Sequence, residues 1–274
     1  MVAFRRGVLA LLLVSACAAC TSGSAHDDVL STRPSSPPAS SSPPSTASAP
    51  GSPTVSSGAA SDDPSAVHRI PPVSAKAHAA GLIDIRTIVS DAIVDLRYAT
   101  SNNFVGVRLY PAGARCLVHE SMAPGLIASA DRLRRGGDLL VFWDCYRPHA
   151  VQLHMFQIVP DPNWVARPGP FATSHEAARS VDVGLAHAAV GAACPSAQRL
   201  QRRCLLDMGT GFDDFSPRAH AFATDGVSPQ AQTNRALLRT AMNGGGITVY
   251  SGEWWHFDGP GADLPRPHLD VAVN

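Results

Sequence analysis

The sequence predicts an α+β domain over residues 67–274, built from a small, mostly antiparallel sheet with flanking helices. Short stretches with strand character and amphipathic stretches with helical character follow one another irregularly. A parallel α/β fold would alternate strands and helices regularly instead. The chain shows no internal repeat, and this part of it has the size that one hydrophobic core can fill.

The first half of the domain begins with two expected strands. Residues 83–89 alternate apolar and polar side chains, as a half-buried strand does, and residues 93–98 have the composition of a second strand. An amphipathic helix is expected at 120–135, ended by the glycine pair at 136–137. The residues expected on its apolar face are Ala123, Leu126, Ile127, Ala130 and Leu133.

The second half begins with a strand at 138–143, which is apolar after its first residue and therefore expected to be buried. Pro148 then opens a helix that continues to about Ile158, because proline fits the first turn of a helix. Further elements expected along the chain are a strand ending at 183–185, a helix at 234–243 stopped by glycines, and a last strand at 247–255 that carries Glu253.

The N-terminus has the pattern of an export signal. Arg5 and Arg6 precede an apolar run that is too short to span a bilayer and suits a signal-peptide core. Small residues before Cys17 are typical of a bacterial lipoprotein cleavage site, and Cys20 is the alternative acceptor. We expect residues 1–20 to be a lipoprotein signal peptide, and the lipid to anchor the exported protein on the outer face of the cytoplasmic membrane. The alternative is an ordinary secretory signal.

Residues 21–66 are expected to be a disordered tether. This segment is rich in Ser, Pro, Ala and Thr and holds hardly any large apolar residue, so it buries too little surface to offset its ordering entropy. Its prolines favour an extended chain that lifts the domain away from the membrane. The formal net charge of the chain is zero, and nothing in it suggests a nucleic-acid partner.

The chain has 6 cysteines, and those beyond the export signal are expected to form disulfides. An exported protein meets an oxidising environment, where disulfides persist. We favour Cys194–Cys204, which closes a short loop, and by default Cys116–Cys145. None of these four cysteines stands in a Cys-x-x-Cys spacing, so a structural zinc site is not expected. Other pairings and free buried thiols are the alternatives.

Two segments carry residues from which a catalytic metal site can be built. His175 and Asp182 stand in the first, and Glu253 and His256 stand among aromatic residues in the second. Two imidazoles and one carboxylate leave a coordination position open, which is typical of catalytic zinc. Glu253 would remain free beside the metal as a general base. The alternative for any single histidine is a solvated or hydrogen-bonded residue, and that is the role we expect for His119, His149 and His154.

The pattern His-x6-Asp at 175–182, followed by Glu-x-Trp-His at 253–256, resembles that of bacterial zinc peptidases that act on D-Ala-D-Ala. The closer resemblance is to the D-alanyl-D-alanine dipeptidase family of the VanX type. Further blocks agree with that family in order and spacing, at 95–106, 143–148 and 207–213. The resemblance covers essentially all of residues 80–260. It implies the fold of the D-Ala-D-Ala metallopeptidases and hedgehog-like domains, with a zinc site in a central cleft.

The resemblance implies one zinc ion per catalytic domain, held by His175, Asp182 and His256. It also implies that Glu253 takes a proton from the attacking water and delivers it to the leaving amine. The expected activity is hydrolysis of D-Ala-D-Ala or a similar D-containing dipeptide, in the turnover of cell-wall peptides. The alternatives are a D,D-carboxypeptidase that acts on longer peptidoglycan peptides, and a non-catalytic lipoprotein that binds the cell wall.

Three further residues receive roles from the same resemblance. Arg147 would stabilise the oxyanion, Asp213 would pair with the free ammonium of a dipeptide, and Ser174 would line the pocket. The alternatives are a surface ion pair between Arg147 and Asp144, and a loop-capping carboxylate for Asp213. The sequence departs from the family pattern at Ala178, where glycine is usual and where alanine should exclude a positive φ, and at Ser180, where alanine is usual. The segment 192–203 looks like an insertion.

Overall fold

The computed structural model describes residues 70–191 and 193–274, so the predicted signal peptide, tether and lipid-anchor cysteines lie outside the described residues. The helices are α1 (Ala75–Ala79), α2 (Ala123–Arg135), α3 (His149–Ile158) and α4 (Pro229–Gly244). The strands are β1 (Leu82–Asp84), β2 (Ile93–Val94), β3 (Leu117–His119), β4 (Asp138–Asp144), β5 (Ser180–His187), β6 (Arg199–Leu200), β7 (Arg203–Cys204), β8 (Thr248–Val249) and β9 (His256–Asp258). Short 3₁₀ helices span Ile85–Thr87, Arg97–Ala99, Glu120–Met122, Ser174–Ala177, Ser196–Gln198 and Pro217–Ala219. Within the described ranges no helix is both long and apolar enough to cross a membrane.

A 5-stranded sheet forms the centre of the domain, with the strand order β2-β4-β5-β9-β8. β2 pairs parallel with β4, whereas the other neighbours pair antiparallel. Two 2-stranded sheets, β1-β3 and β6-β7, accompany it. This arrangement confirms the predicted α+β class with a small, mostly antiparallel sheet.

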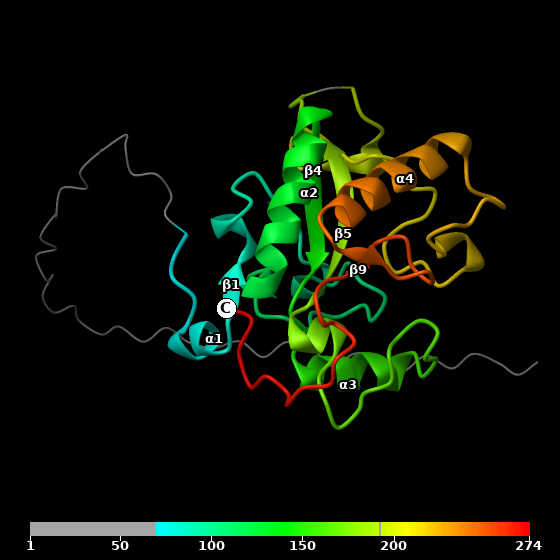
Figure 1. The fold of residues 1–274 in the computed structure, drawn as a ribbon. Helices are drawn as coiled ribbons and strands as arrows, with labels where there is room; N and C mark the ends of the chain where they lie inside the picture. Colours follow the sequence, from blue (N-terminus) through cyan, green and yellow to red (C-terminus); the bar gives the residue numbers. More distant parts are fainter. Residues whose placement is uncertain (1–69, 192) are drawn as a thin grey trace, which may run out of the picture. The chain divides into compact units, whose positions relative to one another are not determined.

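Helices α2 and α4 pack against each other and against the sheet, where α2 contacts β4 and α4 contacts β8 (Figure 1). Gly125 permits this close approach, because a Cβ there would lie 2.4 Å from the carbonyl oxygen of Gly245. Leu126, Ala130 and Leu133 are buried as predicted. Ile127 is 38% exposed, so its assignment to the apolar face was wrong. Gly125 and the buried Ser129 border that face in its place.

The two N-terminal strand predictions were too long. β1 ends at Asp84, whose carboxylate accepts a hydrogen bond of 2.9 Å from the backbone N of Arg86 and turns the chain into the 3₁₀ helix Ile85–Thr87. Such local bonds from an Asp side chain compete with strand pairing. Of the residues at 93–98, only Ile93–Val94 form a strand, and the chain coils into Arg97–Ala99.

The C-terminal elements also differ from the sequence prediction. α4 begins before residue 234, because Ser228 caps its N-terminus and Pro229 occupies the first turn. The segment 247–255 is not one strand but a hairpin, with Glu253 in the turn between β8 and β9. The backbone N of Tyr250 donates to the carbonyl of His256, which closes this turn, and Gly252 within it is a typical turn residue.

Both favoured disulfides are present in the structure. Cys116–Cys145 joins the chain before β3 to the end of β4 and has a Cα–Cα distance of 5.2 Å. Cys194–Cys204 closes the loop ahead of β7, with a Cα–Cα distance of 5.6 Å. The Cys116–Cys145 bond lies next to His175, because the carbonyl of Cys145 accepts a hydrogen bond from Nδ1 of that histidine.

Candidate active site

The strand register of the central sheet places three polar side chains next to one another. Asp144 on β4 lies opposite Asp182 on β5, and Asp182 lies opposite His256 on β9. Residues that are directly opposite on antiparallel strands project to the same face of a sheet. The three side chains therefore form a row across neighbouring strands, although they are far apart in the sequence.

His175 reaches this row from the 3₁₀ helix Ser174–Ala177, which precedes β5. Ala178 ends that helix in the left-handed conformation, with φ 56°. The expectation that an alanine excludes a positive φ here was wrong. The backbone N of Ala178 donates to the carbonyl of His175, and this tertiary context holds a conformation that costs an L residue about 1–2 kcal/mol.

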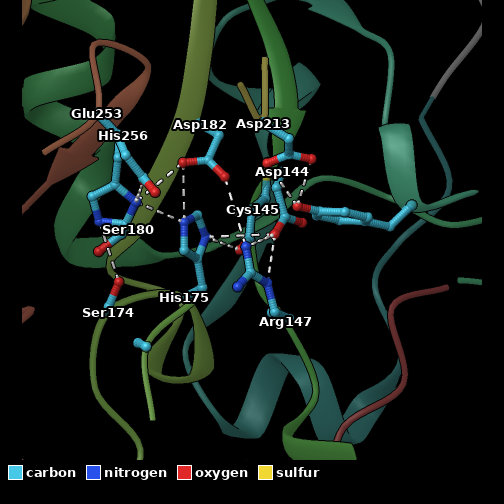
Figure 2. Close-up of polar contacts among 12 residues, drawn as sticks. Asp144, Cys145, Arg147, Ser174, His175, Ser180, Asp182, Asp213, Glu253 and His256 are labelled. Carbon is cyan, nitrogen blue, oxygen red and sulfur yellow. Dashed lines mark hydrogen bonds and ion pairs between the residues drawn. The ribbon is translucent and has the colours of Figure 1, made fainter. Parts of the chain in front are cut away.

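The three predicted metal ligands converge on one point (Figure 2). Nε2 of His175 lies 3.2 Å from Oδ1 of Asp182 and 3.1 Å from Nδ1 of His256, and Nδ1 of His256 lies 3.1 Å from the same Asp182 oxygen. A tetrahedral zinc ion with bonds of about 2.0–2.1 Å separates its ligand atoms by about 3.3 Å. The triangle therefore fits zinc without rearrangement.

The partners of the two rings also suit a metal site. Nδ1 of His175 donates to the carbonyl of Cys145 at 2.7 Å, which leaves the lone pair of Nε2 free to bind a metal ion. Nε2 of His256 lies 3.1 Å from Asp258 Oδ1, which leaves Nδ1 facing the centre of the triangle. Ligating histidines commonly bind a carbonyl or a carboxylate through the second nitrogen in this way.

The carboxylate of Asp182 is buried in this cluster. Burial opposes its ionisation, but charge and hydrogen bonds from His175 and His256 hold the pKa of Asp182 well below its usual range. The aspartate is therefore in the anionic form that coordinates metals.

Glu253 stands beside the triangle without being part of it. Its Oε2 lies 3.9 Å from Nδ1 of His256, and its side chain is 12% exposed. Burial raises the pKa of Glu253 to about 7, although the His256 ring acts in the opposite direction. A carboxylate with such a pKa exchanges protons readily at neutral pH.

Arg147 is held by a buried network at the end of β4. Its Nε and Nη2 donate to Asp144 Oδ2 at 2.8 and 2.7 Å, and its Nη1 donates to Gln152 Oε1 at 2.7 Å. The hydroxyl of Tyr110 donates to the other Asp144 oxygen at 2.7 Å. The ion pair with Asp144 therefore exists, but it is buried rather than on the surface. These bonds fix the guanidinium of Arg147, whose Nη2 also lies 3.7 Å from Asp182 Oδ2.

Asp213 approaches the same space from the loop after β7, with φ 59°. The hydroxyl of Tyr98 donates to its carboxylate at 3.0 Å. Burial, reinforced by the negative charge of Asp182, raises the pKa of Asp213 well above its usual value. The charge of Arg147 offsets this only in part, and within residues 70–191 and 193–274 no cationic side chain forms an ion pair with Asp213.

All predicted catalytic, metal-binding and substrate-binding residues line one cavity of about 670 Å³. Ser174 is among them, with Oγ 3.4 Å from His256 Nε2. The sequence prediction missed Tyr98, Asp258 and the orienting role of Asp144. Tyr98 and Asp144 lie within blocks that carry the family resemblance, and Asp258 lies two residues after His256, the last residue of the final block.

Comparison with known proteins agrees with the geometry. A family model described as D-ala-D-ala dipeptidase matches residues 78–274. A D-alanyl-D-alanine dipeptidase of Escherichia coli (strain K12) is 37% identical over 181 residues, which are 66% of this chain and 86% of the relative. One from Streptomyces coelicolor is 33% identical over 206 residues, 68% of this chain and 95% of the relative. One from Enterococcus faecium is 28% identical over 207 residues, which are 70% of this chain and 98% of the relative. The chain therefore belongs to the D-Ala-D-Ala dipeptidase family and is a peptidase.

Proposed function

We propose that the protein is a zinc-dependent dipeptidase that hydrolyses D-Ala-D-Ala or a similar D-containing dipeptide. The observation that carries this proposal is the convergence of His175, Asp182 and His256 on one point, with Glu253 beside them in the same cavity. Zinc, when bound by these three residues, supplies Lewis acidity that polarises the scissile carbonyl and acidifies water. The names of the relatives supply the substrate class.

Glu253 moves the proton in this proposal. Its carboxylate accepts a proton from the attacking water and then delivers it to the nitrogen of the leaving amine. The position of Glu253 in the β8–β9 turn supports this role, because the side chain is close to His256 yet is not needed as a ligand. Its raised pKa suits a group that must gain and lose one proton in each cycle.

Arg147 and Asp213 carry opposite charges, and each binds a different part of the substrate. The guanidinium of Arg147, fixed by Asp144, stabilises the negative charge that develops on the carbonyl oxygen. Asp213 pairs with the free ammonium of the dipeptide, and Tyr98 fixes its carboxylate for this contact. Asp213 forms no ion pair within the described residues, so the ammonium group would supply a counter-charge to this buried carboxylate. Ser174 lines the pocket close to His256.

We further propose that the protein is exported and held by a lipid on Cys17 or Cys20 at the outer face of the cytoplasmic membrane. The sequence of residues 1–20 supports this location. The two disulfides agree with it, since such bonds persist in oxidising compartments. An enzyme in this place meets dipeptides released from peptidoglycan, which favours cell-wall turnover. Fractionation of cells that places the protein in the cytoplasm would contradict this location.

The reaction is tested by measuring D-Ala released from D-Ala-D-Ala by the zinc-loaded protein and by its Glu253→Gln variant. Release by the parent, with a loss of at least about 100-fold in the variant at unchanged zinc content, supports the proposal. A parent that also cleaves N-acetylated or longer peptides with similar efficiency would be a D,D-carboxypeptidase. A zinc-loaded parent that binds the peptides but cleaves none of them would be a binding protein.

A further inference from the structure

A second group of metal-ligating side chains lies outside the proposed catalytic triangle. His149, Glu176 and His268 each place one ligand atom within 4.8 Å of the other two. They come from three separate parts of the chain: the start of α3, the 3₁₀ helix Ser174–Ala177, and the tail after β9. The sequence prediction treated His149 as a bystander and gave Glu176 and His268 no role.

Glu176 directly follows the proposed zinc ligand His175 in the 3₁₀ helix. Adjacent residues of a 3₁₀ helix point about 120° apart, because the helix has three residues per turn. One turn of chain therefore sends His175 toward the triangle and Glu176 toward the second group. Glu176 is 8% exposed, so its carboxylate is largely withdrawn from water.

The two imidazoles lie close together around this carboxylate. Nδ1 of His149 is 2.5 Å from Oε1 of Glu176, and the ring centroids of His149 and His268 are 3.8 Å apart. Nδ1 of His268 is 3.5 Å from the same Glu176 oxygen. The two nitrogen–oxygen distances, 2.5 and 3.5 Å, lie on either side of the separation of about 3.3 Å between two ligand atoms of a tetrahedral zinc ion.

Only one of the two ring nitrogens of His268 makes a hydrogen bond within the described residues. Its Nε2 lies 3.1 Å from the carbonyl oxygen of Gly169, which can only accept, so Nε2 donates to it. Its Nδ1 faces Oε1 of Glu176 at 3.5 Å, which is longer than a normal hydrogen bond. Within the described part of the chain this buried nitrogen makes no hydrogen bond. A cation between this nitrogen and the Glu176 carboxylate would satisfy both groups.

We propose that His149, Glu176 and His268 form a second binding site for a divalent transition-metal ion, with zinc as the expected occupant. Two imidazoles and a carboxylate are ligands that suit zinc. The side chains of His149 and His268 are 32% and 26% exposed, which leaves a route for the ion and a position for water. Small rotations of these rings give the final geometry.

An ion at this site ties the C-terminal tail to the turn that carries His175. The tail is already attached on either side of His268, where Ala172 pairs with Arg266 and where the hydroxyl of Tyr146 donates to the carbonyl of Leu269. The second site is therefore structural: it fixes the backbone behind the proposed catalytic ligand and takes no part in the chemistry.

The test is the zinc stoichiometry of the full-length chain, by calorimetric titration and by metal analysis after dialysis against buffered zinc. Wild type and the His154→Gln variant, which alters an exposed histidine of the same helix, are expected to bind two ions. His268→Gln and His149→Gln are each expected to bind one. His256→Ala, which disrupts the first site, is expected to retain one ion at the second.

A second readout is thermal unfolding of protein that already holds one equivalent of zinc. Further zinc is expected to raise the Tm of wild type and of His154→Gln, but not that of His268→Gln, because only an ion bound to the folded chain stabilises it. One ion in wild type that is lost in His256→Ala but kept in His268→Gln would overturn the proposal, because the second site would then be empty. Equal binding by wild type and by a folded His268→Gln or His149→Gln variant would also overturn it, since the extra ion would then lie elsewhere.

Discussion

Asp182 and His256 are directly opposite each other on β5 and β9, and Oδ1 of the first lies 3.1 Å from Nδ1 of the second. The pairing of these two strands therefore sets the distance between two proposed zinc ligands. Only His175 must be brought to them by a separate turn. A sheet is stiffer than a loop, so the fold preorganises most of the proposed metal site.

We predict that chelation abolishes peptidase activity and that added zinc restores it. His175→Ala should lose the same activity, but zinc should not restore it, because the triangle of ligand atoms is broken. Hydrolysis of D-Ala-D-Ala is assayed before chelation, after chelation and after zinc is returned. His154→Ala, on an exposed face of α3, is the matched histidine control. Full activity after complete removal of the metal would contradict the zinc proposal.

Asp258 is predicted to tune the affinity of the first metal site. Its carboxylate lies 3.1 Å from Nε2 of His256 and also accepts a hydrogen bond from Ser180. Asp258→Asn should weaken zinc binding about 10–100-fold, the usual effect of removing a carboxylate that orients a ligating histidine. Competition with a chromophoric chelator measures this affinity. Asp263→Asn, an exposed residue of the same cavity, should leave it unchanged, and equal effects of both substitutions would refute the role.

Gly184 is predicted to be intolerant of a side chain. A Cβ at this position of β5 would lie 2.3 Å from the Cη2 atom of Trp143 on β4. Gly184→Ala must therefore displace a large ring in the core, which costs about 1–3 kcal/mol of unfolding free energy. Urea denaturation measures the loss. Gly113→Ala has no atom within 4 Å of the new Cβ and should change stability by less than about 0.5 kcal/mol.

Asp213 is predicted to recognise the free amino group of the substrate. Asp213→Asn removes the charge and should lower kcat/KM for a free dipeptide by about 100-fold, which corresponds to about 2.7 kcal/mol. Slow cleavage of the N-acetylated dipeptide should be unaffected, since it offers no ammonium. The neighbouring Asp214 does not line the cavity, so Asp214→Asn is the control. An equal loss on both substrates would show that Asp213 only supports the loop.

Part of this site was predictable from local signals, and the family resemblance supplied the roles of Arg147, Asp213 and Ser174. The apolar run of β4 and the spacing of His175 and Asp182 are visible along the sequence. The row formed by Asp144, Asp182 and His256 was not, because strand register depends on contacts between distant segments. The hairpin that carries Glu253 and the 3₁₀ turn after Asp84 were missed for a related reason. Side-chain and turn hydrogen bonds override a strand-like pattern there.

Asp84 is predicted to make stability depend on pH. Its buried carboxylate binds Arg86 at 2.7 Å and Arg115 at 2.8 Å. Burial alone would raise the pKa of Asp84, but these two arginines lower it below its usual value. Because the folded pKa lies below the unfolded value of about 3.9, the stabilisation is complete above that pH and is lost as the pH falls through the folded pKa.

Asp84→Asn should therefore cost about 3 kcal/mol of unfolding free energy at pH 7, since it leaves Arg115, which is 10% exposed, without its counter-charge. The difference from wild type should shrink below pH of about 3.9. Denaturant unfolding of both proteins across this range gives the comparison. Asp91→Asn, which removes a more exposed pair with Arg134, should cost less than about 1 kcal/mol. A loss for Asp84→Asn that is equally large at low and neutral pH would mean that the carboxylate is not ionised in the folded protein.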